Sequence, residues 1–364
     1  MPLSNLLRRR IAATGPMTVA DFMAEALGHP EHGYYTQREP FGASGDFVTS
    51  PEISQIFGEL IGAWCVHQWV QMGAPAKFNL VELGPGRGAL MADLLRTVAK
   101  ISPGFRDAAD LHLVETSPRL RAVQARALSG ARPVWHAALS DLPEGPLLCI
   151  ANEFFDALPI RQFVRTSVGW AERLIDLDPS GERLRFVVGG AQPAASFFIP
   201  ADLLGAPPGS IVEISPAAWT LAHELAERVT VYGGTALIID YGSTRSGIGD
   251  TLQAVRTHRY ATVLESVGQA DLTAHVDFAM LAQAALEAGG AVHGPVTQAE
   301  FLTALGIRER SAMLQQKASP EQRDAIQAAV GRLIGEDQMG NLFKVLALTD
   351  GKGPQPAGFM EPTS

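Results

Sequence analysis

Short apolar stretches alternate with longer amphipathic stretches along most of this chain. The apolar stretches have the length of strands, and the amphipathic ones place apolar residues at helical spacing. The predicted strands of the first half lie at 78–83, 111–115, 133–136 and 146–152, with predicted helices at 88–99 and 117–128. Strands that alternate with helices are typical of a parallel sheet covered by helices on both faces. The pattern therefore predicts an α/β fold.

The alternation is interrupted twice in the second half. Residues 160–214 contain short β-like pieces between glycine and proline turns, which predicts a β-rich insertion, and residues 297–337 predict a helical insertion. The remaining core elements are helices at 216–228 and 276–287 and strands at 235–242, 291–296 and 341–349. Together the two halves predict a seven-stranded, Rossmann-like sheet.

The residues before the first strand have helical periodicity. In this preface, residues 1–76, the sequence TSPE at 49–52 has the chemistry of a helix start, and we expect a helix from there to Gly73. Its apolar stripe predicts core packing. The chain thus divides into a preface or lid, a core at 77–350 that contains both insertions, and a tail at 351–364. The tail is rich in glycine and proline and is expected to be disordered.

Composition and charge favour a soluble enzyme over a nucleic-acid-binding or membrane protein. Hydrophobic residues make up 46% of the chain and the net charge is −9, so there is no basic footprint for nucleic acid. Cys65 and Cys149 lie inside apolar runs without ligand spacing, which predicts buried reduced thiols. Arg8, Arg9 and Arg10 resemble the start of a transit peptide, but they pass directly into helical periodicity. A cytoplasmic protein without a membrane segment is therefore expected.

The residues after the first predicted strand form a glycine-rich loop. Gly84, Pro85, Gly86 and Gly88 follow an apolar strand that ends in an acid, and they precede an amphipathic helix. Glycines allow a tight turn and a close approach of the backbone to a ligand. The start of the helix offers unpaired N–H groups to an anionic group. This arrangement predicts a nucleotide-like cofactor, with a plain turn between strand and helix as the simpler alternative.

Two acids decide between two classes of cofactor. Gly84, Gly86 and Ala89 also fit the dinucleotide fingerprint, which expects a ribose-binding acid about 20 residues further on. Here the strand-end acid Glu115 lies 31 residues past Gly84, and Glu82 lies two residues before it. A carboxylate at the loop suits a cationic ligand better than a pyrophosphate. S-adenosylmethionine has a sulfonium and an ammonium group and is therefore the expected cofactor, with Glu115 on its ribose.

A second group of candidate residues follows the fourth predicted strand. Asn152, Glu153 and Asp156 lie at its carboxyl end, which is where open α/β sheets bind ligands. A carboxylate at this position can hold a cationic amine or guanidinium in line with a methyl donor. The alternative is that Asn152 and Asp156 cap the following turn while Glu153 is solvated.

Four separated motifs resemble one known family. The sequences GDFVTSPEISQIFGELIG, LVELGPGRG, ANEFFDALP and DLTAHVDF, in this order, are similar to those of the MidA-like S-adenosylmethionine-dependent methyltransferases. Mitochondrial members of that family assist the assembly of respiratory complex I. The similarity extends over nearly the whole chain. It implies a class I methyltransferase fold, methylation of a protein arginine, and a core subunit of NADH dehydrogenase as the partner protein.

The resemblance also implies roles for the acids after the fourth strand. Arginine methyltransferases place a glutamate there to bind the guanidinium group, and Glu153 in the sequence NEFFD occupies this position. Asp156 is a candidate for the second carboxylate, although the longer paired-glutamate loop of the wider class is missing. Arginine stays charged at neutral pH, and a pair of carboxylate oxygens matches its planar geometry.

Four more residues are candidates, each with a simpler alternative. Asp46 and Ser50 of the preface are expected to close over the cofactor, by analogy with helical lids, or to form a turn and a helix cap. Asp141 follows the third strand and is either an acceptor for the adenine amino group or an exposed loop acid. His275 is either an acid/base group, since histidine titrates near neutrality, or a structural hydrogen-bonding residue.

Two functions remain open from the sequence. The first is a methyltransferase that acts on an arginine of a partner protein. The second is an assembly factor or binding module that keeps the cofactor fold and acts by docking to a partner. The intact glycine loop together with Glu82 and Glu115 favours the enzyme, because a scaffold has no physical need for this combination.

Overall fold

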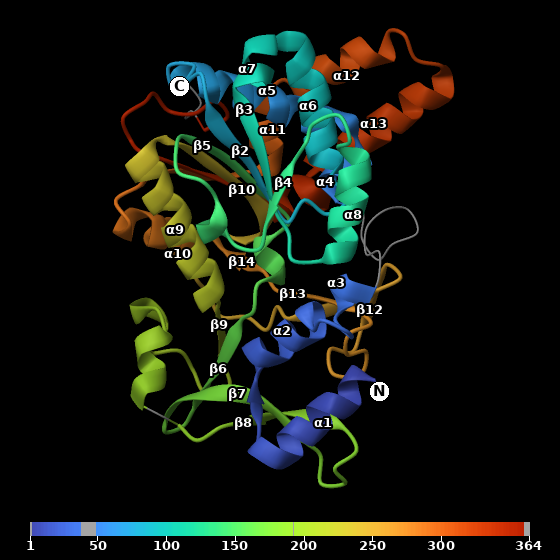
Figure 1. Ribbon diagram of the computed structural model, residues 1–364. Coiled ribbons are helices and arrows are strands. Elements are labelled where there is room, and N and C mark those ends of the chain that lie inside the picture. Colours follow the sequence, from blue (N-terminus) through green and yellow to red (C-terminus); the bar gives the residue numbers. More distant parts are fainter. Residues whose placement is uncertain (1, 38–48, 192, 360–364) are drawn as a thin grey trace. The chain divides into compact units, whose positions relative to one another are not determined.

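The computed structural model describes residues 2–37, 49–191 and 193–359, and it divides into two compact units (Figure 1). Unit 1 comprises Met1–Phe47, Asp156–Thr220 and Arg245–His275, and unit 2 comprises Val48–Phe155, Leu221–Thr244 and Val276–Ser364. The preface that the sequence pattern groups together is therefore shared between the two units, with the boundary after Phe47.

A central sheet organises unit 2. Its strands, in spatial order, are β15 (Ala291–Thr297), β16 (Phe343–Thr349), β10 (Gly234–Ser243), β5 (Leu147–Asn152), β2 (Phe78–Leu83), β3 (Ala109–Val114) and β4 (Val134–His136). The strands from β10 to β4 are parallel, β16 is antiparallel to both of its neighbours, and the short β14 (Val276–Asp277) also pairs with β10. The predicted α/β fold with seven core strands is confirmed.

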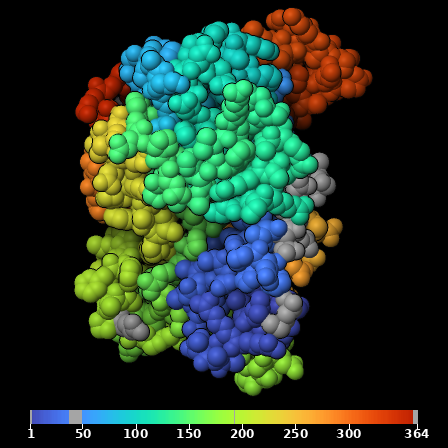
Figure 2. Space-filling view, viewed as in Figure 1, coloured from blue at the N-terminus to red at the C-terminus, as the bar shows by residue number. Residues whose placement is uncertain are grey.

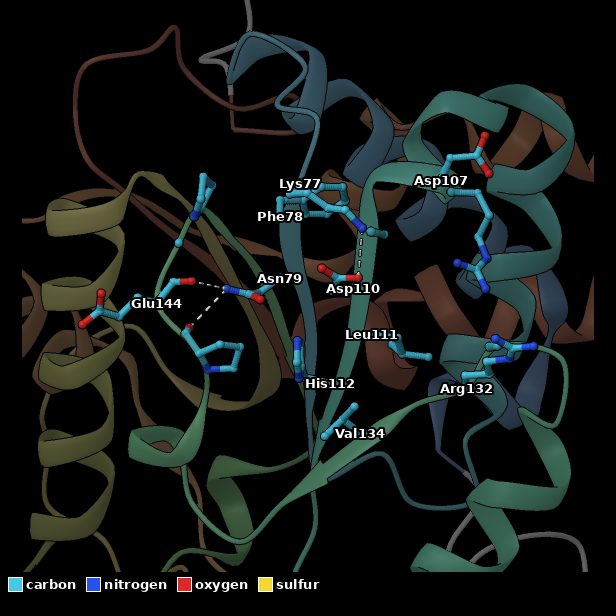
Figure 3. A pocket seen from close by; sticks show the side chains of 16 residues that line it. Lys77, Phe78, Asn79, Asp107, Asp110, Leu111, His112, Arg132, Val134 and Glu144 are labelled. Atoms are coloured by element: carbon cyan, nitrogen blue, oxygen red, sulfur yellow. Dashed lines mark hydrogen bonds and ion pairs between the residues drawn. The ribbon is translucent and has the colours of Figure 1, made fainter.

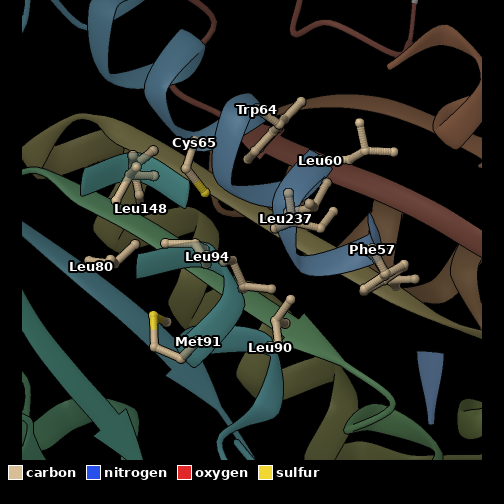
Figure 4. Close-up of a cluster of buried hydrophobic side chains, with 14 of the residues drawn as sticks. Phe57, Leu60, Trp64, Cys65, Leu80, Leu90, Met91, Leu94, Leu148 and Leu237 are labelled. Carbon is tan, nitrogen blue, oxygen red and sulfur yellow. The ribbon is translucent and has the colours of Figure 1, made fainter. Parts of the chain in front are cut away.

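Helices flank this sheet. They are α4 (Ser50–Ile53), α5 (Gln55–Gln71), α6 (Ala89–Ile101), α7 (Pro103–Ala108), α8 (Pro118–Ala127), α9 (Pro216–Tyr232) and α10 (Phe278–Glu287). Figure 4 shows Phe57 and Trp64 of α5 and Leu94 of α6 packed together with strand residues such as Leu80. Burying each such side chain contributes about 1.5–3 kcal/mol. The apolar stripe of the preface helix is thus core packing, as its spacing predicts.

The predicted preface helix is two helices in the structure. Ser54 interrupts it with an extended backbone (φ −157°, ψ 134°), so α4 ends at Ile53 and α5 begins at Gln55. The Ser54 hydroxyl accepts a hydrogen bond from the Ile56 N–H at 3.2 Å and thereby caps α5. Because of this break, Ser50 lies at the start of the separate short helix α4.

Unit 1 combines small helices with two antiparallel sheets. Its helices are α1 (Leu3–Thr14), α2 (Val19–Gly28) and α3 (Tyr34–Gln37). One sheet contains β1 (Met17–Thr18), β6 (Arg161–Thr166), β7 (Gly169–Leu177), β8 (Leu184–Val188) and β9 (Ile211–Ile214), and the other contains β11 (Gln253–Arg256), β12 (Arg259–Ala261) and β13 (Asp271–Thr273). Because β7 pairs with β1 and Ile175 lies in the core of α1 and α2, the β-rich segment 160–214 is a structural part of this unit.

The helical segment 297–337 belongs to unit 2. It contains α11 (Gln298–Ala304), α12 (Ile307–Gln315) and α13 (Pro320–Ile334), seen in orange at the upper right of Figure 2. Glu59 of α5 is buried and pairs with Arg310 of α12 at 2.7 Å and with Arg96 of α6 at 3.3 Å. Since an unpaired buried carboxylate would be costly, these partners connect the segment to the core.

The C-terminal residues correct one expectation. The composition of the tail predicts disorder, but Phe359 is buried in the main core beside Phe301, and the Trp64 indole donates a hydrogen bond to the Ala357 carbonyl at 3.0 Å. The expected disorder is therefore wrong for residues 351–359. Phe359 packs in the apolar core, and local composition does not reveal such a contact between distant segments. Cys65 and Cys149 are buried free thiols, as predicted. Among the described residues, no helix has the length and apolar character needed to cross a membrane.

Candidate functional site

The glycine loop connects β2 to α6 at the carboxyl edge of the central sheet. The φ angles of Gly84, Gly86 and Gly88 are +60°, +53° and +82°. The Gly84 N–H donates to the Val114 carbonyl at 3.0 Å, and the Gly88 N–H donates to the Pro85 carbonyl at 2.7 Å. All three glycines therefore adopt left-handed conformations that L side chains rarely adopt, which is the physical reason for glycine at these positions.

A buried amide joins the glycine loop to the end of β3. Gln124 of α8 donates through Nε2 to the Gly86 carbonyl at 2.9 Å and to Glu115 Oε2 at 3.1 Å, and its Oε1 accepts from the Trp135 indole at 2.8 Å. Glu115 Oε1 accepts from the Ser117 N–H at 2.8 Å. Burial raises the pKa of Glu115, and the hydrogen bonds from Ser117 and Gln124 oppose that shift. The carboxylate is thus held in a fixed orientation beside the loop.

The chain turns sharply where β5 ends. Glu153 has a φ of +51°, which is uncommon for a residue other than glycine. Its Oε1 accepts hydrogen bonds from the Ser50 N–H at 2.8 Å and from Asn152 Nδ2 at 3.2 Å. The half-buried Glu153 carboxylate therefore connects the start of α4 to the end of β5.

Three buried polar atoms near these loops have no hydrogen-bond partner within the described residues. They are Ser50 Oγ, Glu82 Oε2 and Asn152 Oδ1, and their side chains belong to residues that are 0%, 3% and 8% exposed. Glu82 pairs with Ile150 in the sheet, so Glu82 and Asn152 project from the same face of neighbouring strands. Buried polar groups are nearly always hydrogen-bonded. This edge of the sheet is therefore suited to a polar ligand.

Burial has a strong effect on Glu82. It raises the pKa of this carboxyl from 4.5 to about 8. The side chain is consequently protonated at neutral pH until a positive charge comes close to it. A cationic ligand would favour the ionised form, whereas a phosphate would not.

Of the other predicted site residues that the structure describes, two lie in unit 1 and one lies in unit 2. Asp156 and His275 belong to unit 1, where Asp156 is buried and His275 is exposed. Asp141 is exposed in unit 2, and its Oδ2 accepts two backbone N–H groups of its own turn at 3.2 and 3.0 Å. Asp46 lies outside the described residues. Within unit 2 the structure therefore brings together the glycine loop, Glu82, Glu115, Ser50, Asn152 and Glu153.

A cavity of about 820 Å³ opens at the opposite edge of the same sheet (Figure 3). It is lined by the first residues of β2 and β3 and by the turn before β5, with charged side chains of both signs, among them Lys77, Asp110, Arg132 and Glu144. Lys77 Nζ and Asp110 Oδ1 are 3.5 Å apart. Because ligands of open α/β sheets bind at the carboxyl ends of the strands, this cavity is not part of the candidate site.

Sequence reasoning missed two residues that shape the site. Gln124 lies on a helix face and does not stand out from its neighbours in the sequence, whereas Asp240 is a charged residue inside an apolar strand. Asp240 is fully buried and accepts hydrogen bonds from the Phe154 and Phe155 N–H groups. A charged residue within the run TALIID is the one signal that indicated a buried polar contact.

The chain matches known proteins over most of its length. Residues 60–296 match the model of a family described as S-adenosyl-L-methionine-dependent methyltransferase. "Protein arginine methyltransferase NDUFAF7, mitochondrial" from Xenopus laevis is 41% identical, and the alignment covers 95% of this chain and 84% of the relative. The Homo sapiens protein of the same name is 37% identical, with coverages of 95% and 83%. These names place the relatives in mitochondria and contradict the expectation of a cytoplasmic protein.

A solved structure agrees in fold and in ligand class. A COG1565 superfamily member from Burkholderia thailandensis, solved with bound S-adenosyl-homocysteine, superposes with a TM-score of 0.82 at 28% identity. The match covers 99% of this chain and 92% of that chain. S-adenosyl-homocysteine is the product that remains after S-adenosylmethionine gives up its methyl group.

Proposed function

Because this chain belongs to the family of S-adenosylmethionine-dependent methyltransferases, we propose that it methylates an arginine of a partner protein. S-adenosylmethionine is its cofactor, as in the family. The position of Glu153 is the main structural support for an arginine substrate: a carboxylate at the end of β5, in the same unit as the glycine loop and oriented by two hydrogen bonds. The relatives named as protein arginine methyltransferases support the same substrate class.

The residues at the carboxyl edge of the sheet fit the chemistry of S-adenosylmethionine. Glu82 would meet its positive charge, Glu115 would accept from the ribose hydroxyls, and the left-handed glycines leave the backbone of the loop open to a ligand. Ser50 Oγ and Asn152 Oδ1, which have no hydrogen-bond partner in the described part of the chain, offer further polar contacts. In this proposal Gly84, Pro85, Gly86 and Gly88 form the loop that holds the cofactor.

The chemistry requires mainly that two reactants are held in line. When bound, S-adenosylmethionine would supply a methyl group from its sulfonium, which becomes a neutral thioether, while the methylated nitrogen loses one N–H proton to solvent. Glu153 would orient the cationic guanidinium through charge-assisted hydrogen bonds. Its Oε1 is held by Ser50 and Asn152, so the carboxylate keeps one orientation while the substrate binds. Fixed orientation of this kind is a large part of catalysis in displacement reactions.

Labelling identifies the substrate directly. Purified protein is incubated with methyl-labelled S-adenosylmethionine and a lysate from a strain that lacks the gene, and labelled proteins are digested and sequenced. The proposal expects label on arginine in a small number of proteins. Label on another residue type would overturn the arginine assignment, and no label would favour the alternative of a factor that acts by docking.

We propose a core subunit of NADH dehydrogenase as the partner protein. The resemblance to the MidA-like family is the support for this partner. The same labelling experiment, with purified NADH dehydrogenase subunits in place of the lysate, tests it separately from the arginine chemistry. Transfer to lysate proteins without transfer to these subunits would leave the methyltransferase in place and exclude this partner.

Asp156, Asp141 and His275 remain proposed contributors to substrate or cofactor binding.

The affinity for S-adenosylmethionine is expected to rise with pH up to about 8. Burial raises the pKa of Glu82 to about 8, so the free protein holds a proton there at neutral pH. A cationic cofactor favours the carboxylate, and its binding therefore releases a proton. Calorimetry in buffers of different ionisation enthalpy measures this release.

The raised pKa of Glu82 affects the stability of the free protein in the opposite direction. The free energy of unfolding falls as the pH rises from 4.5 towards 8, because the buried carboxyl must then ionise.

Glu82→Gln provides the control for this prediction. Glutamine cannot ionise, so proton release due to Glu82 should disappear. Any pH dependence that persists comes from other groups, such as the amine of the cofactor or Glu115, whose pKa is also raised by burial. Equal proton release by the variant and the wild type would contradict the assigned role of Glu82.

Unit 1 presents apolar side chains that are expected to contact the protein substrate. Phe197 and Val168 of segment 160–214 are 90% and 83% exposed. Deleting the segment would not test the contact with the substrate. Its strands share a sheet and a core with the rest of unit 1, so the deletion would disrupt the unit itself. Phe197→Ser should instead weaken labelling of the partner several-fold while cofactor affinity stays unchanged. Val70→Ser on α5, at a residue that is 56% exposed, is the matched control, and equal effects of both changes would contradict the prediction.

A further inference from the structure

Asp240 is a buried carboxylate on β10 that contacts the loop after the neighbouring strand β5. It is fully buried. Its Oδ2 accepts from the N–H groups of Phe154 at 3.1 Å and Phe155 at 2.9 Å, and its Oδ1 accepts from the Tyr241 N–H at 2.9 Å. Three backbone donors therefore surround one carboxylate, and hydrogen bonds to an ionised acceptor are the stronger kind.

Strand β10 also binds Glu153, the residue that precedes Phe154 and Phe155. The Glu153 N–H donates to the carbonyl of Ile239, which precedes Asp240. Two consecutive residues of β10 thus bind three consecutive N–H groups, those of Glu153, Phe154 and Phe155. Glu153 has its left-handed φ of +51° at this point. An uncommon backbone conformation persists where the surroundings determine it several times over, as they do here.

The fixed loop contacts two other parts of the candidate site. The Glu153 carboxylate accepts from the start of α4 and from Asn152. The Phe154 ring lies against the glycine loop, where a Cβ added to Gly84 would be 2.5 Å from Phe154 Cδ2. A shift of this loop would therefore move Glu153 and would also change the space above Gly84.

We propose that Asp240 is a positioning residue for methyl transfer. It acts through the loop: by binding the Phe154 and Phe155 N–H groups, it sets the direction of the Glu153 side chain and the place of the Phe154 ring beside Gly84. This inference rests on the proposed function, in which Glu153 orients the substrate. Asp240 itself touches neither cofactor nor substrate in this role.

Asp240→Asn tests the proposal with little change in size. A carboxylate offers two acceptor oxygens to three N–H groups, whereas an amide offers one oxygen and places an NH₂ group against at least one donor. Label transfer to lysate proteins at saturating S-adenosylmethionine should fall about tenfold to a hundredfold, the range expected for losing a hydrogen bond to a charged group. Cofactor affinity by calorimetry should fall by a much smaller factor than label transfer, because Phe154 only borders the glycine loop whereas Glu153 orients the substrate. Hydrogen exchange at Phe154 and Phe155 should become faster.

Glu59→Gln is the matched control, because Glu59 is a buried carboxylate of the same unit that is bound by Arg310 and Arg96 instead. It should lower stability without changing transfer by the folded fraction. The double variant Asp240→Asn/Glu153→Gln should be no slower than the slower single variant, because both changes act through one side chain. If Asp240→Asn does not fold, Asp240→Ser replaces it.

The outcomes separate this proposal from the one on which it depends. Wild-type protein that transfers no label overturns the proposed function. Unchanged exchange at Phe154 and Phe155, wild-type transfer by Asp240→Asn, or additive losses in the double variant overturn the positioning role alone. Parallel losses of transfer and of cofactor affinity would also overturn it, since they would show that Asp240 supports the fold in general.

Discussion

A Gly86→Val variant is expected to bind S-adenosylmethionine more than about a hundredfold more weakly than the wild type, a loss of roughly 3 kcal/mol. Gly86 has a φ of +53°, which a β-branched residue avoids, so the loop must rearrange. Its carbonyl is also the acceptor for Gln124, which holds Glu115 as well. Strain and side-chain bulk therefore act on both parts of the proposed cofactor site. Calorimetry with S-adenosylmethionine measures the effect.

Gly73→Val is the matched control for backbone strain. Gly73 lies at the end of α5 with a φ of +85°, and no heavy atom among its described neighbours lies within 4 Å of an added Cβ. The control variant should show a comparable loss of thermal stability with unchanged cofactor binding. The assignment of the glycine loop would be overturned by normal affinity in Gly86→Val, or by tight NAD binding with none of S-adenosylmethionine.

Glu153→Gln is expected to slow methyl transfer by about one to two orders of magnitude. Hydrogen bonds to charged groups contribute roughly 1.5–3 kcal/mol, and about 1.4 kcal/mol corresponds to a factor of ten in rate. Glutamine keeps the size of the side chain, and its oxygen can still accept from the Ser50 N–H. The variant therefore removes charge with little change in shape. Single-turnover label transfer at saturating cofactor gives the rate, and calorimetry should show nearly unchanged affinity.

Glu287→Gln is the matched control for the loss of charge. Glu287 is an exposed carboxylate of α10 in the same unit and accepts from Gln283 Nε2 at 2.9 Å, so the rate should not change with it. Asp141→Asn tests the proposed adenine contact separately, and there only cofactor affinity should fall. If Glu153→Gln transfers label at the wild-type rate, or loses cofactor affinity in proportion to activity, Glu153 does not orient the guanidinium group of the substrate.

The fold could be predicted from the sequence because its strands are locally distinct. The strand predicted at 78–83 is β2, the one predicted at 235–242 is one residue shorter than β10 at each end, and the one predicted at 341–349 begins two residues before β16 and ends with it. Such strands are short apolar runs between polar turns, so their pattern survives without tertiary information. The break at Ser54 could not be predicted, because serine within an apolar helical pattern is compatible with both a cap and a helix interior.

The candidate site could be predicted only where backbone chemistry fixes the residue type. The three glycines adopt positive φ, so their spacing in the sequence already indicates the turn. Glu153 was indicated by its place at a strand end, although its left-handed backbone was not. Gln124 and Asp240 act on residues 38 and 85 or more positions away, and no local pattern encodes such partners.

The sequence by itself determined the order of strands and helices along the chain, the glycine loop, and the acids Glu82 near the end of β2 and Glu115 after β3, because each depends on neighbouring residues. Only the tertiary structure decided which side chains meet. It placed Asp156 and His275 in unit 1 and Glu153 in unit 2, although Asp156 follows Glu153 closely in the chain. It also brought Phe359 into the core. Burial and hydrogen bonding between distant segments are set by packing, and they appear only when the whole chain is folded.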